Sequence, residues 1–123
     1  MEGLIYLAKI RINYDLKTND ETIKKEILGI KNNNVIVFKD DEYIVNIQVL
    51  DNKIIMKREN NEVILEIHLG IVNKCTYFLK QYKSNLELDI KLIELKINDL
   101  NVYFKYELND ELKEFNLKYE VIK

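Results

Sequence analysis

Apolar and polar residues alternate along the first part of the chain. Every second residue from Leu4 to Leu16 is apolar, and from Lys9 onward the residues between them are polar or charged. Successive side chains of a β-strand point to opposite faces, so this period separates an apolar face from a hydrated one. The pattern predicts a long, half-buried strand that ends at the turn-forming residues 18–20.

The same alternation recurs in four further segments, 43–49, 63–69, 102–108 and 115–121. Polar stretches rich in Asn and Asp separate the apolar runs, and these two residues tolerate the left-handed backbone of tight turns. The stretches are 31–34, 40–42, 51–53, 58–61, 82–85, 98–99 and 109–111. Turns repeated at such short intervals are typical of antiparallel hairpins in a sandwich or a barrel.

Two segments, 20–30 and 86–100, fit either a strand or a helix. Apolar residues with helical spacing occur in both, namely Ile23, Ile27 and Ile30, and then Leu86, Ile90, Ile93, Ile97 and Leu100. In the second segment the apolar alternation shifts by one residue at Ile93, which is the signature of a β-bulge. Because the surrounding segments are antiparallel strands, we favour strands in both places.

The predicted strands each have one apolar face, which must be covered. Closing the sheet on itself covers these faces and removes exposed edges. We therefore predict one all-β domain over residues 1–123, a single antiparallel up-and-down β-barrel of about 8–10 strands. A barrel of about eight strands is either filled by side chains or holds one small ligand, and both alternatives remain open.

The predicted inner face is rich in aromatic residues. They are Tyr6, Tyr14, Tyr43, Tyr77, Phe104, Tyr106, Phe115 and Tyr119. A buried tyrosine hydroxyl needs a hydrogen-bonding partner. These hydroxyls therefore either reach solvent at the rims of the barrel or face a cavity that holds water or an amphipathic ligand.

Several stretches of the chain carry a family resemblance. They are 53–58, the strand 63–69 with the following Gly70 and Tyr77, the ending 102–119, and Gly29 before the Asn-rich turn. Together they resemble the YwiB-like family of small bacterial cytosolic proteins of uncharacterised function. Over roughly 4–122, the resemblance implies a calycin-like (lipocalin-like) β-barrel. The turn at 81–85 lacks the glycine and proline that relatives often carry there.

Composition excludes several classes of function. The formal net charge is −2 and no apolar run approaches the ~18 residues that cross a bilayer, so we expect no nucleic-acid and no membrane partner. The single cysteine fits a reducing compartment. Because the start of the chain lacks the features of a signal peptide, we expect a cytoplasmic protein. Separately, we expect it to be a monomer or a weak homodimer.

No catalytic or metal-binding pattern emerges from the sequence. His68 and Glu66 share one face of a strand, but that face is the outward one, and zinc requires at least three protein ligands. Cys75 is in phase with apolar neighbours, which predicts a buried residue rather than a nucleophile. Ser84 lies in a turn without a nucleophile motif. We therefore expect no enzymatic activity, no metal and no cofactor.

Arg58 is the most informative charged residue. It continues the phase of Ile54 and Met56, so it is predicted to turn into the mouth of the barrel. There its guanidinium would suit a carboxylate or a phosphate. The alternative is a solvent-exposed arginine at the end of a hairpin. Combined with the tyrosines, the hypothesised ligand-binding set is Arg58, Tyr14, Tyr43, Tyr77, Tyr106 and Tyr119.

Two functions follow from these patterns. The favoured one is non-catalytic binding of a small apolar or amphipathic ligand in the barrel interior. The alternative is a ligand-free module for protein interaction or homo-oligomerisation, because exposed apolar patches often mark partners. The residues taken as outward and apolar for this alternative are Ile5, Leu7, Ile36, Phe38, Ile44 and Phe78.

Overall fold

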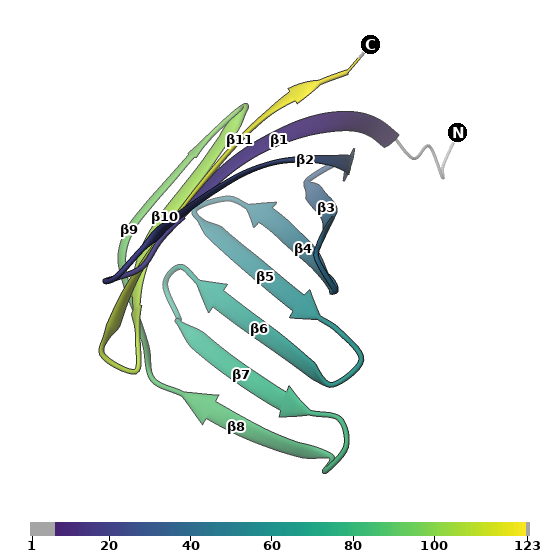
Figure 1. Cartoon of the computed structure of the whole chain (residues 1–123). Coiled ribbons are helices and arrows are strands. Elements are labelled where there is room, and N and C mark those ends of the chain that lie inside the picture. Colours follow the sequence, from purple (N-terminus) through teal and green to yellow (C-terminus); the bar gives the residue numbers. More distant parts are fainter. Residues whose placement is uncertain (1–6, 123) are drawn as a thin grey trace.

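The structure is a computed structural model that describes residues 7–122. All regular elements in this range are strands (Figure 1). They are β1 Leu7–Lys17, β2 Thr22–Asn32, β3 Val35–Asp40, β4 Tyr43–Leu50, β5 Lys53–Glu59, β6 Val63–Leu69, β7 Lys74–Leu79, β8 Ser84–Leu88, β9 Ile90–Asn98, β10 Asn101–Leu108 and β11 Glu111–Val121. No helix long and apolar enough to cross a membrane occurs among these residues.

The strands form one antiparallel sheet that curls into a nearly closed barrel. Its order is β8-β7-β6-β5-β4-β3-β2-β1-β11-β10-β9, so neighbours in sequence pair along the sheet and β1 closes onto β11. The two edges are β8 and β9, which follow each other in the chain without pairing. The predicted all-β, antiparallel, up-and-down barrel is confirmed, with eleven strands in residues 7–122 where the sequence predicts about 8–10.

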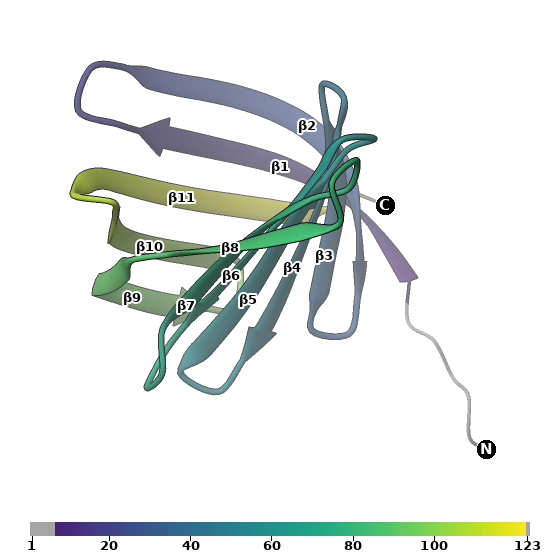
Figure 2. The same cartoon turned by 90° about the horizontal axis from the view of Figure 1, so that it is seen from below.

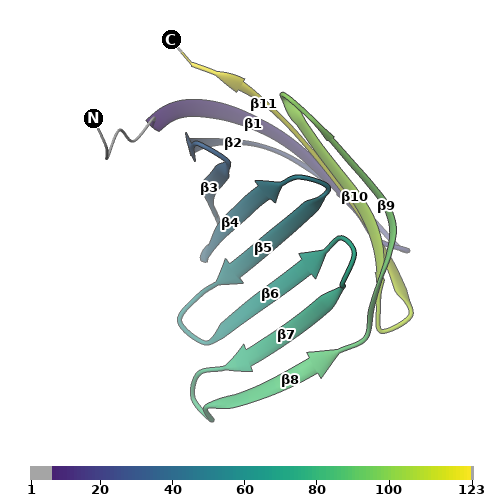
Figure 3. The same cartoon turned by 180° about the vertical axis from the view of Figure 1, so that it is seen from behind.

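The barrel has two layers that face each other across the core. Strands β3 to β8 lie side by side in one layer, and β9, β10, β11, β1 and β2 form the other (Figure 3). The core residues include Ile10, Ile12, Ile47, Phe104 and Leu117, all with zero exposure. In contrast, β2, β8 and β9 contribute no fully buried side chain to this core, only partly buried ones such as Ile27, Leu88 and Leu92. The packing is therefore thinnest at those three strands.

The sheet turns its corner at β2. This strand pairs with β1 from Thr22 to Asn32 but with β3 only from Gly29 to Asn32. At the start of the shared part, Gly29 lies so close to its neighbours that an added Cβ would be 2.8 Å from Ile12 Cδ1 and 2.8 Å from the Val37 carbonyl oxygen. Only glycine permits this close approach of the backbone.

Most of the turns contain the Asn and Asp residues that the sequence predicts there. Asn33, Asp41, Asn52, Asn109 and Asp110 adopt positive φ angles between 49° and 66°. These are the Asn and Asp positions expected to accept left-handed backbone. The remaining non-glycine residue with positive φ in the described range is Lys83, φ 47°, which ends the turn 80–83 directly before β8.

Both ambiguous segments are strands, as favoured from the sequence. Of segment 20–30, residues 22–30 lie in β2. Segment 86–100 contains the end of β8, a break at Asp89, the whole of β9 and the turn residues 99–100. In β9, Glu94 pairs with Lys105 and Leu92 with Tyr106, so Ile93 is the extra residue of a bulge. The predicted shift in phase is confirmed, with Ile93 itself exposed rather than starting the new inward phase.

One predicted orientation is wrong. The sequence analysis predicts Ile36 and Phe38 to face outward, but both are buried, with exposed fractions of 1% and 4%. The segment 35–38 is a continuous apolar run without a period, so its phase is set by pairing with Ile47 and Val45 of β4. Of the other outward residues proposed, Leu7 and Ile44 are exposed and Phe78 is half-buried. Leu4, Ile5 and Tyr6 lie outside the described residues.

Candidate functional site

A small cavity opens at one mouth of the barrel, between the two layers. It is bounded by the ends of β1, β3, β5 and β10 and by the start of β11, and its volume is about 80 Å³. Aliphatic side chains line one part of it, among them Leu16, Met56, Leu65 and Leu108. The polar side chains that line it are Tyr14, Asp40, Arg58, Tyr106 and Lys113.

Asp40 is the buried carboxylate of this mouth, with 7% exposure. Its Oδ2 accepts a hydrogen bond from the Tyr14 hydroxyl at 2.5 Å, and its Oδ1 accepts one from Lys25 Nζ at 2.6 Å. Burial opposes ionisation of this carboxyl, but the hydrogen bonds from Lys25 and Tyr14 outweigh it and hold the pKa of Asp40 below its ordinary value. Asp40 is therefore an ionised group whose acceptors are already engaged.

Both the ring and the hydroxyl of Tyr14 are held by neighbouring side chains. Its ring stacks on Phe115 with centroids 5.4 Å apart and contacts Phe38 at 5.7 Å. Burial raises the pKa of the Tyr14 hydroxyl, and the hydrogen bond to Asp40 raises it further. The phenol stays protonated and acts as a donor, so it braces Asp40 and offers the cavity mainly its ring.

Arg58 lies where the sequence predicts it, at the mouth. It pairs with Val45 on one side and Leu65 on the other, in phase with the core. Its guanidinium carbon sits 4.2 Å above the centre of the Tyr43 ring, and Nη2 is 3.9 Å from Asp40 Oδ2. Nε of Arg58 is buried and donates to no acceptor among residues 7–122.

Two further donors approach the same cavity. Burial raises the pKa of Tyr106 to about 12, so its hydroxyl remains protonated. Within the described part of the chain, the Tyr106 hydroxyl forms no hydrogen bond, whereas the Tyr14 hydroxyl donates to a carboxylate and the Tyr119 hydroxyl to a backbone carbonyl. Lys113 lines the cavity from β11. Neither Asp40 nor Lys113 was singled out from the sequence as part of a site.

The structure brings some of the hypothesised residues together and separates others. Arg58, Tyr14 and Tyr106 line the cavity, and Tyr43 supports Arg58 from outside it. Tyr77 is half-buried and is not part of the cavity lining. Tyr119 lies beside Asp99 in a separate recess, where its hydroxyl donates to the Asp99 carbonyl oxygen at 2.5 Å.

The other candidate chemistry does not assemble. His68 Nε2 lies 2.8 Å from Glu66 Oε2, and both side chains are partly exposed at the surface. Cys75 is buried at 1% exposure, and burial raises the pKa of its thiol. Between residues 7 and 122, no group of three or more His, Cys, Asp or Glu side chains could hold a metal ion.

Fold and site together define a small antiparallel barrel, nearly closed, with one mouth lined by cationic and phenolic donors. A solved structure with this fold is that of the YwiB protein from Bacillus subtilis. The two structures superpose with a TM-score of 0.74 over 97% of this chain and 96% of that one, at 13% sequence identity. No family model and no curated protein matches the sequence. The resemblance predicted from the sequence is thus confirmed at the level of the fold.

Proposed function

We propose that this chain is a calycin-like, non-catalytic binding barrel whose mouth holds the anionic group of a small amphipathic molecule. The observation that carries the proposal is Arg58, which lines the cavity with a buried Nε that has no acceptor among the described residues. A buried donor without a partner costs about 1–3 kcal/mol. A carboxylate in the cavity would supply the missing acceptor and would be held by the fork geometry of the guanidinium.

The charge balance of the mouth favours an anion. Arg58 and Lys113 line the cavity with two positive charges, against the single negative charge of Asp40, while Lys25 beside it is paired with both Asp40 and Asp41. Lys25 is already bonded to Asp40, which leaves Arg58 and Lys113 with the Tyr106 hydroxyl to meet an incoming carboxylate. The surrounding aliphatic side chains would bury the first carbons of the ligand.

The size of the cavity limits the ligand to a few atoms inside the mouth. Its volume of about 80 Å³ is well below the roughly 300–1,000 Å³ of pockets that enclose drug-sized ligands. Deeper in the barrel the space is taken by side chains such as Phe104, Ile12 and Leu117, which have zero exposure. We therefore assign the ligand to the mouth and not to the interior as a whole.

Isothermal titration with hexanoate, 1-hexanol and hexylammonium tests this function. We expect hexanoate to bind with a dissociation constant of roughly 0.1–1 mM, in line with the efficiency of small ligands. Hexanol and the cation, which share its chain, should bind at least about tenfold more weakly because they offer no anionic acceptor. Equal affinity for all three would contradict the role of the guanidinium.

The chain offers a matched control, since it has two arginines. The Arg58→Met variant keeps an unbranched stem and should lose hexanoate binding. Arg11→Met removes the same charge from the outer surface, where Arg11 is paired with Glu26 and Glu120, and should bind as the wild type does. Loss of binding in both variants would indicate a general charge effect and refute the site.

Cys75 is relevant to the cellular compartment of the protein. It is a free, buried thiol, and free thiols persist in reducing compartments. This supports the assignment of the chain to the cytoplasm.

A further inference from the structure

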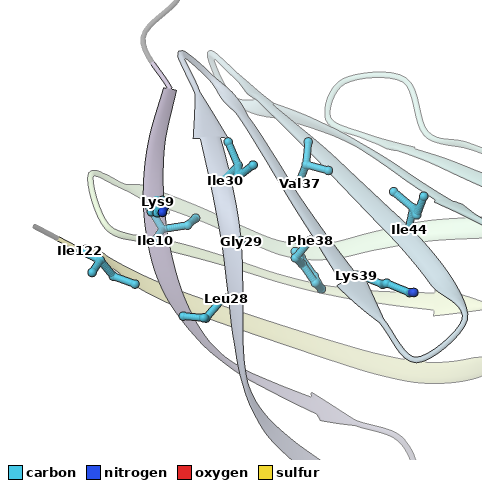
Figure 4. A pocket seen from close by; sticks show the side chains of 10 residues that line it. All are labelled: Lys9, Ile10, Leu28, Gly29, Ile30, Val37, Phe38, Lys39, Ile44 and Ile122. Carbon is cyan, nitrogen blue, oxygen red and sulfur yellow. The ribbon is translucent and has the colours of Figure 1, made fainter.

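A second hollow lies on the outer face of the sheet, at the corner between β2 and β3 (Figure 4). It is a groove of about 510 Å³ in which aliphatic side chains from several strands meet, among them Leu28, Ile30, Val37 and Ile44. Leu28 is 68% exposed and Ile44 57%. None of the polar residues of the barrel mouth lines this groove, so it is a separate site.

The groove adjoins a free strand edge. β2 pairs with β3 only from Gly29 onward, so the backbone of Thr22–Leu28 has no strand partner on that side. Figure 2 shows this half of β2 as the outermost strand of its layer, running away from β3. An edge of this kind presents unpaired N–H and C=O groups that another chain can pair with.

Lysines surround the groove. Lys9 and Lys39 are among its lining residues, and Lys24 is exposed on the free part of β2. None of the three forms an ion pair within the described range, whereas the nearby Arg11 forms two. No acidic side chain of residues 7–122 lines the groove. On the same face Glu26 and Glu120 pair with Arg11, so Lys9, Lys24 and Lys39 still leave the charge around this apolar surface net positive.

We propose that the free edge of β2 and the adjoining groove bind an extended segment of a partner protein that carries both apolar and acidic residues on one face, at every second position. The backbone of that segment pairs with Thr22–Leu28, and an apolar side chain near the corner enters the groove beside Leu28 and Ile44. Its acidic side chains, on the same face as this apolar side chain, approach the lysines. Strand addition of this type takes affinity from the backbone and specificity from alternate side chains.

The other occupants agree less well with the surface. A second copy docked face to face through this groove would place its Lys9 and Lys39 against the same lysines, since a two-fold interface is self-complementary. A fatty-acid chain would use the groove and the lysines but would leave the unpaired backbone of Thr22–Leu28 unused. Both remain as outcomes that the experiment separates.

The probe is a synthetic eight-residue valine–glutamate peptide, Thr-Glu-Thr-Val-Thr-Glu-Thr-Val, added to the full chain; valine and glutamate then share one face of the strand and threonine occupies the other. We expect binding by fluorescence anisotropy and slower hydrogen exchange at amides within Thr22–Leu28. The edge strand β8 serves as the internal reference, with unchanged exchange. A valine–lysine peptide of the same length should bind at least about tenfold more weakly.

Two substitutions locate the site. Leu28→Glu should weaken binding of the valine–glutamate peptide about tenfold or more, and Ile71→Glu should leave it unchanged, because Ile71 is 98% exposed and lies outside the groove. Arg58→Met should also leave it unchanged, which separates this site from the barrel mouth. No binding at millimolar peptide, equal binding of both peptides, or no protection of Thr22–Leu28 would overturn the proposal. Binding of dodecanoate that Leu28→Glu abolishes would overturn it in favour of a fatty-acid site. Concentration-dependent dimerisation that Leu28→Glu abolishes would overturn it in favour of a second copy of the chain.

Discussion

The substitution Gly29→Ala tests the corner of the barrel. The new Cβ would lie 2.8 Å from Ile12 Cδ1, 2.8 Å from the Val37 carbonyl oxygen and 3.2 Å from Phe38 Cβ. The Val37 oxygen is held in the β2–β3 ladder, and Ile12 has zero exposure, so neither can move away freely. Overpacking of this kind costs about 1–3 kcal/mol, and the small entropic gain of alanine over glycine offsets only part of it.

Urea denaturation measures this effect. With a dependence of about 2 kcal/mol per molar urea, the middle of the usual range, the midpoint should fall by roughly 0.5–1.5 M. Gly70→Ala is the matched control, because the nearest atoms there, at 3.2–3.4 Å, belong to Lys53 and the Asn52 carbonyl. Residues 52 and 53 lie in an exposed turn and its first strand residue, where a shift of a few tenths of an ångström is easier than in the core, so this change should cost clearly less than Gly29→Ala.

A double variant identifies the clash as the cause. Ile12→Val removes Cδ1 and alone should cost about 0.5–1.5 kcal/mol. In the Gly29→Ala background the same change should cost less, or even restore stability, because it clears one of the two 2.8 Å contacts. If Gly29→Ala is as stable as the wild type, or if the two changes simply add, the close-packed corner is refuted.

Three further predictions concern Asp40, Cys75 and Tyr119. The pKa of Asp40 is lowered on folding, so its contribution to stability is present above its unfolded pKa of about 4 and is lost as pH falls through the folded value. Asp40→Asn should be less stable by about 1–3 kcal/mol at pH 7, with a difference that shrinks below about pH 4; a difference constant with pH would contradict this. Cys75 is buried with a raised pKa, so a thiol reagent should react with it only in denaturant, and rapid labelling of the native chain would contradict its burial. Tyr119→Phe removes the hydrogen bond to the Asp99 carbonyl and should lower thermal stability by about 0.5–1.5 kcal/mol, with no effect on hexanoate binding at the other mouth.

The alternation of apolar residues predicts most of the fold, because one buried face fixes the phase of a strand. It correctly places Ile10, Ile12 and Tyr14 inside, and a one-residue slip in it indicates the bulge at Ile93. It fails at 35–38, where every residue is apolar and the phase is decided by the neighbouring strand. The local sequence pattern does not show how a strand pairs with its neighbour.

The site was only partly predictable for the same reason. Arg58 could be found because it continues an inward phase. Asp40 reads as the start of a polar turn, and nothing local reveals that Tyr14 and Lys25 converge on it from 26 and 15 residues away. Lys113 likewise joins the mouth through the pairing of β10 with β11. Such contacts depend on the register of the closed sheet.

The most direct measurement of the proposed function is the NMR signal of the Arg58 Nε–H group during a hexanoate titration. Arg58→Met identifies this signal, because Arg11 is the one other arginine of the chain. A new hydrogen bond to a carboxylate should shift the Arg58 signal downfield, saturably and with the dissociation constant found by calorimetry, while the Arg11 signal stays in place. An Arg58 signal that does not move while hexanoate binds would contradict the account, because the ligand would then lie elsewhere.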